Sequence, residues 1–253
     1  MKNNIFIATS TFAVHSQVPL TILDGGKRRI IINPLFRKLS PNELIKYASD
    51  SIGIVAGTEI YSRDVLSQLP KLKVISRLGV GMDNIDLETV KERNIQVFKT
   101  ATTPAPAVAE LTIGMMIDLA RKITIQHQNI INGTWEKEMG VLLQEKTLGI
   151  IGLGTIGKTL VKLVKGFNFN ILAFDLNEDK LFAKNYGVNY CNLDTLLDKS
   201  DIVSIHLNFS DETKRLINED KLHKMRSESI LINTSRGEII DEDALFRVLK
   251  EKK

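Results

Sequence analysis

Short apolar runs alternate with longer segments of helical period along most of this chain, and the alternation occurs twice. In the first half it predicts strands at Ile5–Ala8, Arg29–Ile32, Ser51–Ala56, Leu72–Arg77 and Ile95–Phe98. Helices are predicted between them at Pro41–Ala48, Ser62–Gln68 and Asp86–Arg93, the first with Ser40 as its N-cap. Parallel strands joined by crossover helices give this pattern, and five of them predict a flavodoxin-like lobe.

In the second half the same alternation follows a long amphipathic helix predicted at Pro106–Lys122. Strands are predicted at Thr147–Ile151, Asn170–Phe174, Val188–Tyr190, Ile202–His206 and Ser229–Asn233, with a last helix at Asp241–Lys250. A doubly wound dinucleotide-binding domain has six strands, and five are visible here. The predicted fold is therefore α/β, with a flavodoxin-like lobe (residues 1–100) and a doubly wound Rossmann lobe (residues 101–253) that lacks its last strand.

Composition narrows the function classes. The 253 residues carry a net charge of +4, but lysine and arginine are interleaved with acidic residues and form no basic run, which argues against nucleic-acid binding. No apolar stretch approaches the roughly 18 residues of a membrane span. Cys191 is the only cysteine, so one chain can form neither a disulfide nor a cysteine metal cluster. The run Ile5–Ala8 is too short for a secretory signal, and we expect a cytoplasmic protein.

The strongest local signal is a glycine pattern that directly follows a buried strand. Gly152, Gly154 and Gly157 come after Ile151, and a helical run from Lys158 to Lys165 follows. In dinucleotide-binding loops the first glycine permits a tight turn, the second lets amides approach a pyrophosphate, and the third lets helix and strand pack closely. The helix N-terminus adds partial positive charge. This context predicts a pyrophosphate cradle.

An acid stands where such a loop needs one. Asp175 ends the next predicted strand, about twenty residues on, where a carboxylate accepts hydrogen bonds from the adenosine ribose. A plain turn with Asp175 as a surface cap is the alternative, but it leaves the coincidence of both features in one βαβ unit unexplained. Because the carboxylate would repel a 2′-phosphate and no arginine follows directly, the pattern favours NAD over NADP; Lys180 is the nearest base.

Two further places are candidates for substrate chemistry. Arg236 follows the predicted strand that ends at Asn233, and its planar fork suits the carboxylate of a 2-keto acid; a surface pair with Glu238 or Asp241 is the alternative. In the first half, a turn contains two glycines, one of them Gly81, and its amides can hold a carboxylate. The alternative is a turn with a structural role only. Nearby Arg77 suggests an anionic tail on the substrate.

The four histidines suggest no catalytic base and no metal site. His206 follows an apolar strand, and we interpret it as a hydrogen-bonded structural group because no acid stands three or four residues away to orient it. The others, His15, His127 and His223, lie in segments without metal-ligand spacing.

Taken together, these motifs resemble the D-isomer-specific 2-hydroxyacid dehydrogenase family, and within it the D-3-phosphoglycerate dehydrogenase branch. The resemblance runs nearly from end to end and is specific because so many motifs occur in order. It rests on Ala56–Glu59, Leu69–Arg77, Gly79–Asp86, Val108–Thr112, Lys146–Gly149, the glycine loop, Asp201–Leu207, Thr213, Leu231–Gly237, Asp241, Ala244 and Leu245.

The resemblance implies hydride transfer between NAD(H) and a small 2-hydroxy or 2-keto acid, 3-phosphoglycerate among the candidates, in a homodimer built largely on the cofactor domain. It assigns dinucleotide contacts to Thr155, Ile156 and Asp175, the ribose and nicotinamide side to Leu207, Thr213 and Thr234, the catalytic arginine to Arg236, and the substrate-facing turn to Val80 and Gly81.

The chain also departs from the family pattern. Asn208 and Ala101 stand where proline is common, which changes loop rigidity rather than chemistry. Members of the family continue into a sixth strand with a glutamate, a loop with the acid/base histidine, and a helix that returns to the first lobe. The resemblance therefore predicts a truncated chain. Two interpretations stay open: an NAD-dependent 2-hydroxyacid dehydrogenase, or a non-catalytic NAD(H)-binding remnant or half of a split enzyme.

Overall fold

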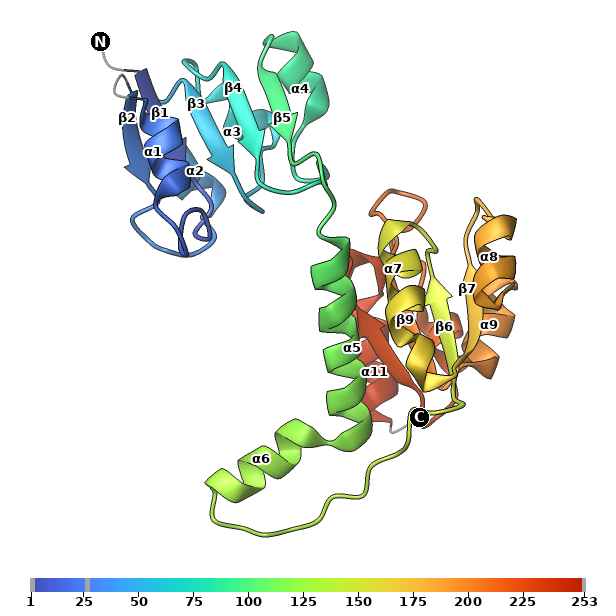
Figure 1. The fold of residues 1–253 in the computed structure, drawn as a ribbon. Coiled ribbons are helices and arrows are strands. Elements are labelled where there is room, and N and C mark those ends of the chain that lie inside the picture. Colours follow the sequence, from blue (N-terminus) through green and yellow to red (C-terminus); the bar gives the residue numbers. More distant parts are fainter. Residues whose placement is uncertain (1–2, 26–27, 252–253) are drawn as a thin grey trace. The chain divides into compact units, whose positions relative to one another are not determined.

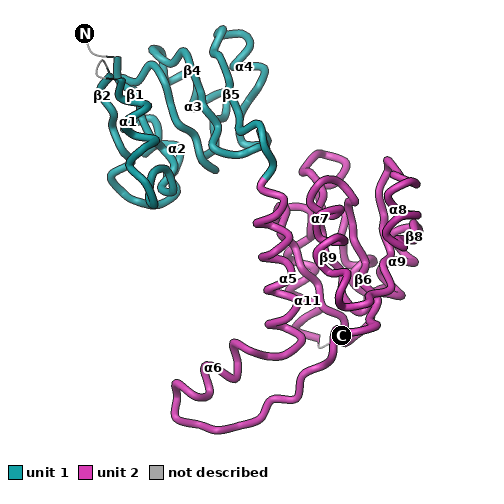
Figure 2. The backbone as a smooth tube through the Cα atoms, in the orientation of Figure 1, with its two compact units in different colours: residues 1–103 teal, residues 104–253 magenta. Residues whose placement is uncertain are grey.

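The computed structural model describes residues 3–25 and 28–251, which form two compact units (Figure 2). Unit 1 runs from Met1 to Thr103 and unit 2 from Pro104 to Lys253. The sequence pattern places the division after residue 100, three residues earlier than the structure does. Each unit has its own parallel sheet and its own core, which agrees with the predicted α/β fold class (Figure 1).

The sheet of unit 1 has the strand order β2-β1-β3-β4-β5, with all pairs parallel. Its strands are β1 Asn3–Ile7, β2 Arg28–Ile32, β3 Gly53–Ala56, β4 Val74–Arg77 and β5 Gln96–Lys99. This is the flavodoxin order that the five predicted strands implied. Each predicted strand lies within a few residues of an observed one.

Three helices cover one face of this sheet: α2 Pro41–Ala48, α3 Arg63–Ser67 and α4 Leu87–Glu92. At the start of α2 the Ser40 hydroxyl accepts from the Glu43 amide and the Glu43 carboxylate accepts from the Ser40 amide, so the predicted N-cap is a full capping box. A further helix, α1 Val18–Asp24, was not predicted. It has no side-chain cap and buries none of its residues, so the sequence carries no strong signal for it.

Unit 2 holds a second parallel sheet, with the order β10-β9-β6-β7-β8 among the described residues. Its strands are β6 Thr147–Ile151, β7 Asn170–Phe174, β8 Val188–Tyr190, β9 Ile202–Ile205 and β10 Ile230–Asn233. The strand order reverses at β6: β7 and β8 lie on one side of it, and β9 and β10 on the other. The boundary between β6 and β9 is therefore the switch point at which ligands of doubly wound sheets bind.

Helices pack on both faces of this sheet. One face carries α5 Ala105–Arg121, α7 Thr155–Leu163 and α8 Lys180–Tyr186. The other carries α9 Leu193–Lys199, α10 Glu219–His223 and α11 Glu242–Lys250. The 3-10 turns η1 Val164–Phe167 and η2 Gly237–Ile239 follow α7 and precede α11. Because both faces are covered, the strands can be apolar throughout, as the pattern indicated.

One helix does not join either layer. The helix α6, Ile123–Ile131, buries none of its residues, and Figure 1 shows it and the following loop extending away from the sheet of unit 2. The loop returns to the end of α5 at residue 141, where the Val141 amide donates to the Ala120 carbonyl at 2.8 Å. The segment had no predicted element, since its apolar residues face no core.

Candidate functional site

The register of the second sheet brings four residues into one row. Ile151 of β6 lies opposite Phe174 of β7 and Ile205 of β9, and Ile205 lies opposite Asn233 of β10. The next residue along each strand therefore stands at the same carboxyl edge. These four are Gly152, Asp175, His206 and Thr234. Ligands of open α/β sheets bind beyond this edge, and the row straddles the switch point.

Two of the predicted glycines are required by close packing. Gly152 has φ +95°, and a Cβ built there would lie 2.8 Å from the His206 carbonyl oxygen. A Cβ at Gly157 would lie 2.5 Å from the Gly152 carbonyl oxygen, so α7 can approach the end of β6 only at a residue without a side chain. The loop is therefore held tight against the neighbouring strand β9.

Gly154 differs from these two because space is open around it. A Cβ built there meets nothing within 4 Å, and the residue is the exposed N-cap of α7. The first hydrogen bond of α7 runs from the Lys158 amide to the Gly154 carbonyl at 2.9 Å, so the amides of Thr155 and Ile156 precede the helical ladder. An anion can approach this backbone without meeting a side chain, as a pyrophosphate requires.

Asp175 braces the glycine loop. Its Oδ2 accepts from the Leu153 amide at 2.7 Å, and its Oδ1 accepts from the Asn177 amide at 2.8 Å. Each carboxylate oxygen has a second lone pair, so the side chain can still accept from ribose hydroxyls. The half-buried carboxylate thus fixes the loop and stands beside it, as the predicted ribose contact needs.

Two polar side chains that the sequence patterns did not indicate hold the segment before Arg236. The Asn233 side chain accepts from the Ser235 amide at 2.9 Å and donates to the Arg236 carbonyl at 2.7 Å. The Ser235 hydroxyl donates to the Ile205 carbonyl at 2.8 Å. Asparagine and serine commonly make such local turns, so their position directly after a strand is a sequence signal for this role. Arg236 itself is half-buried and donates to the Ser235 carbonyl at 3.1 Å.

A chain of side-chain hydrogen bonds runs behind the row. Ser204 Oγ lies 2.9 Å from His206 Nε2, and His206 Nδ1 lies 3.4 Å from Thr234 Oγ1. Thr234 Oγ1 lies 3.3 Å from Thr112 Oγ1, on α5. Burial lowers the pKa of His206 to about 4, so the ring is neutral at neutral pH. Both ring nitrogens have partners within the protein, as expected for a structural histidine.

The loop after β9 is fixed by Thr213. Its hydroxyl accepts from the Ser210 amide at 2.8 Å and donates to the Asn208 carbonyl at 2.9 Å. Leu207 points back toward the glycine loop, because its Cδ2 would lie 3.0 Å from a Cβ at Gly152. Leu207 therefore lies beside the glycine loop, whereas the hydrogen bonds of the Thr213 hydroxyl are within its own loop.

The predicted substrate residues Arg77, Val80 and Gly81 belong to unit 1. Arg77 ends β4, is buried, and donates to the Leu78 carbonyl, and among the described residues its Nε has no hydrogen-bond partner. Val80 and Gly81 are half-buried in the turn that follows. Arg77 also lines a hollow of about 550 Å³ together with Arg28 and Lys99. Unit 1 thus offers a cationic concave surface.

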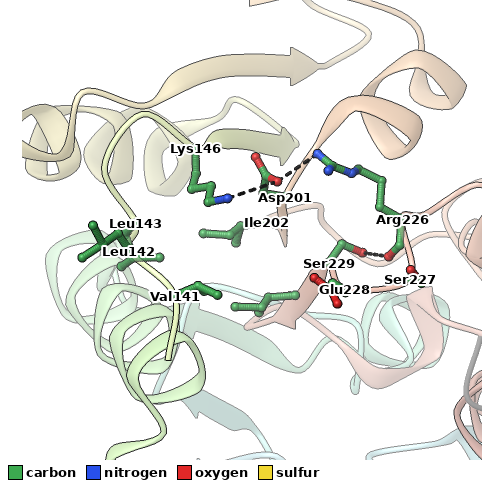
Figure 3. A pocket seen from close by; sticks show the side chains of 11 residues that line it. Val141, Leu142, Leu143, Lys146, Asp201, Ile202, Arg226, Ser227, Glu228 and Ser229 are labelled. Carbon is green, nitrogen blue, oxygen red and sulfur yellow. Dashed lines mark hydrogen bonds and ion pairs between the residues drawn. The ribbon is translucent and has the colours of Figure 1, made fainter. Parts of the chain in front are cut away.

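At the opposite, amino edge of the second sheet lies a smaller cavity of about 200 Å³ (Figure 3). Its polar centre is Asp201, which accepts from the Thr147 amide at 2.9 Å and pairs with Arg226 at 2.9 Å and Lys146 at 4.0 Å. The carboxylate is occupied by three residues from two segments of the chain. We therefore interpret this cluster as a structural tie.

Two other features are absent from the described ranges. No group of three or more histidine, cysteine or acidic side chains in residues 3–25 and 28–251 could hold a metal ion. Over the same ranges, no helix has the length and apolar character needed to cross a membrane.

Comparison with known proteins agrees with this geometry. Residues 113–253 match the family described as D-isomer specific 2-hydroxyacid dehydrogenase, NAD binding domain. The chain is 37% identical over 220 residues to the D-3-phosphoglycerate dehydrogenase of Methanocaldococcus jannaschii, a match that covers 85% of this chain and 42% of the relative. It is 36% identical over 211 residues to the hydroxypyruvate reductase of Thermotoga maritima, covering 82% and 68%. The chain thus spans less than half of the first relative's length.

Solved structures agree as well. The apo-structure of D-lactate dehydrogenase from Escherichia coli has a TM-score of 0.84 at 29% identity, covering 99% of this chain and 79% of that one. The D-lactate dehydrogenase of Aquifex aeolicus, solved with NAD and lactic acid, has a TM-score of 0.81 at 28% identity, covering 99% and 74%.

Gly154→Val tests the pyrophosphate cradle. Because a side chain there fills space that is open in the free protein, we expect unchanged thermal stability but NADH binding weakened about 100-fold or more. Calorimetric titration measures the affinity. Gly166→Val is the matched control, since a Cβ at that exposed glycine also meets nothing within 4 Å. Equal NADH affinity for Gly154→Val and wild type would show that the loop does not carry the cofactor.

Asp175→Ala tests cofactor choice. Its carboxylate would face the phosphate dianion of NADPH, so its removal should narrow the preference for NADH over NADPH by about tenfold. The same variant frees the Leu153 amide, which should weaken both cofactors alike. The informative quantity is therefore the ratio of the two dissociation constants, with Asp175→Asn as the second charge-removing variant. A ratio that stays at the wild-type value in both variants refutes the assignment.

Proposed function

The chain belongs to the D-isomer-specific 2-hydroxyacid dehydrogenase family, and on this premise we propose that it transfers a hydride between NAD(H) and a small 2-hydroxy or 2-keto acid. One observation carries the proposal. The row of Gly152, Asp175, His206 and Thr234 at the switch point is continuous with an open, side-chain-free helix start at Gly154 and with the anchored segment before Arg236.

We propose that unit 2 holds the dinucleotide along this row. The amides of Gly154, Thr155 and Ile156 would receive the pyrophosphate, and Asp175 the adenosine ribose. Leu207, Thr213 and Thr234 would border the nicotinamide side. NADH, when bound, supplies the hydride for reduction of the keto acid. The fit of the residues to this cofactor rests on the left-handed turn at Gly152 and the empty approach to Gly154.

Arg236 would orient the substrate. Its guanidinium can hold a carboxylate through two parallel hydrogen bonds and, from the same position, polarise the adjacent keto oxygen. Negative charge that develops on that oxygen is stabilised by a cation held in place before the reaction. The proton that completes the new hydroxyl would come from solvent water, since Arg236 stays protonated. The anchors at Asn233 and Ser235 fix the backbone that carries this side chain, which limits the reorganisation needed on binding.

Unit 1 carries the other residues that we propose for substrate binding. We propose that the turn at Val80 and Gly81 faces the substrate and that Arg77 attracts an anionic tail, since its hollow is also lined by Arg28 and Lys99. Relatives are named for D-3-phosphoglycerate, hydroxypyruvate and glyoxylate. Each of these acids has a carboxylate next to the carbon that is oxidised or reduced. The proposed substrate class is therefore small 2-keto acids, including phosphorylated ones.

We also propose a homodimer that buries the arm, defined as residues 123–142. This arm exposes apolar side chains on a scale unusual for a free surface: Trp135 is 79% and Met139 83% exposed, and no residue of α6 is buried. The neighbouring face of α5 adds Leu111 and Leu119, each 53% exposed. Aromatic and methionine side chains are enriched in the cores of such interfaces. The family resemblance favours a second copy of the chain as the partner.

The state of the Cys191 thiol supports a proposal for the compartment in which the protein works. Cys191 is a free, half-buried cysteine, and burial raises the pKa of its thiol, which keeps it in the less reactive protonated form. A chain with one unpaired cysteine fits a reducing environment. We therefore propose that the protein works in the cytoplasm.

Arg236→Gln tests the catalytic proposal. With NADH absorbance followed in the presence of glyoxylate, hydroxypyruvate, pyruvate and 3-phosphohydroxypyruvate, we expect wild type to oxidise NADH with at least one of them. The variant should lose about 100-fold in kcat/KM because the charged fork is gone, while its NADH affinity is unchanged. Arg215→Gln is the matched control, an exposed arginine that lies 3.8 Å from Asp241. NADH binding without oxidation by any of the four acids would favour a non-catalytic dinucleotide-binding chain.

Trp135→Glu tests the arm. Light scattering of the wild type should give twice the 28.4 kDa mass of one chain. A charge in the centre of a buried apolar interface should shift the population to monomer at micromolar concentration. Leu181→Glu is the control, because Leu181 is also a highly exposed apolar residue and lies on α8, outside the arm. A wild type that is monomeric, or a Trp135→Glu variant that stays dimeric, contradicts the proposal.

A further inference from the structure

The hydrogen-bond chain that includes His206 and Thr234 connects the row to the buried interior of unit 2. It joins Ser204 of β9, His206 at the end of β9, Thr234 at the end of β10, and Thr112 in the middle of α5. Thr112 and Ser204 are fully buried. Buried hydroxyls require partners, and here four side chains from three elements satisfy one another.

The direction of every bond in this chain follows from its last member. The Thr112 hydroxyl lies 2.8 Å from the Val108 carbonyl oxygen, which can only accept, so Thr112 donates its single proton there. Its oxygen must then accept from Thr234. Because the Thr234 proton is committed to Thr112, Thr234 cannot donate to the imidazole.

The same reasoning fixes the tautomer of the histidine. His206 Nδ1 must carry the proton and donate to Thr234 Oγ1, so Nε2 is the bare nitrogen and accepts from the Ser204 hydroxyl. The chain needs a neutral ring, and the lowered pKa of His206 keeps the ring neutral at neutral pH. A single proton order therefore runs from β9 through β10 to α5.

We propose that His206, as the neutral Nδ1-protonated tautomer, is a positioning residue that sets the place of Thr234 and thereby of the arginine two residues later. This rests on the proposed function of Arg236. His206 is well suited to the task because its main chain is fixed from the other side: its amide donates to the Ile151 carbonyl at 2.8 Å, and its carbonyl lies directly against Gly152. The ring thus links the glycine loop to the segment that carries Arg236.

Loss of the imidazole should affect the rate of the reaction more than the affinity for the cofactor or the stability of the fold. The backbone after Thr234 is already anchored by Asn233 and Ser235, so loss of the imidazole should not unfold the loop. It should let the Thr234 end drift, which misplaces the guanidinium. A small misplacement of an orienting group lowers the rate more than it lowers the affinity for NADH, because the proposed pyrophosphate and ribose contacts at Gly154 and Asp175 do not involve the imidazole.

The first arm of the test needs no turnover. In protein labelled with ¹⁵N-histidine, ring-nitrogen chemical shifts report which nitrogen carries the proton, and the signals of His206 are those missing in His206→Asn. We expect a protonated Nδ1 and a bare, hydrogen-bonded Nε2 at neutral pH. A protonated Nε2, or two averaged shifts typical of exchanging tautomers, overturns the proposal. This result stands even if the chain proves to consume no NADH, so the two failures are distinguishable.

The second arm uses variants that differ only in what they donate. Asparagine places an amide N–H near the position of Nδ1, whereas leucine has none. We expect His206→Leu to lower kcat/KM for the keto acid about tenfold, mainly in kcat, and to lower NADH affinity by a smaller factor, since the pyrophosphate and ribose contacts remain. His206→Asn should recover most of this loss. Thr112→Val, an isosteric change on α5 far from the glycine loop in sequence, should reproduce the leucine effect.

The outcomes separate positioning from packing. A merely structural histidine would give leucine and asparagine variants with equal activity losses that follow their melting temperatures. Equal kcat/KM in the two His206 variants, or an unchanged kcat/KM in Thr112→Val, overturns the proposal. Where wild type consumes no NADH, the ring-nitrogen shifts decide it alone.

Discussion

The register between four parallel strands is the constraint on which the rest of unit 2 depends. Because β6, β7, β9 and β10 pair in parallel with Ile151, Phe174, Ile205 and Asn233 in line, the chain leaves the sheet four times at one edge. A one-residue slip would turn each following side chain to the other face and separate Asp175 from the glycine loop. The glycine turn, the ribose acid, the imidazole and the arginine segment thus share one geometric cause.

Packing on both faces maintains that register. The helices α5, α7 and α8 bury one side of the sheet and α9, α10 and α11 the other, so a slip would disrupt close packing on both sides. Gly157 lets α7 approach the end of β6 closely enough that its first amides stand over the row. At the far edge, Asp201 ties the start of β6 to Arg226, ahead of β10. The site is therefore a product of the whole domain rather than of the loop alone.

Sequence reasoning succeeded where a local pattern has a local cause. The strands at Thr147–Ile151, Asn170–Phe174 and Val188–Tyr190 begin and end as predicted, because strands buried on both faces read as short apolar runs. It failed for α1 and α6, which bury no side chain and so leave no periodic apolar face to detect. It also missed the partners of His206. Thr112 and Thr234 are 122 residues apart in the chain, and no spacing rule connects them.

The central claim is that NADH lies along the carboxyl edge of the second sheet, and amide chemical-shift mapping tests it most directly. When NADH is titrated into uniformly ¹⁵N-labelled protein, the account predicts that the largest shifts fall on the glycine loop and on Asp175, His206 and Thr234. The residues around Asp201, at the amino edge, should not move. Saturable shifts centred on Lys146, Asp201 and Arg226, or no saturable shift at all, would contradict it.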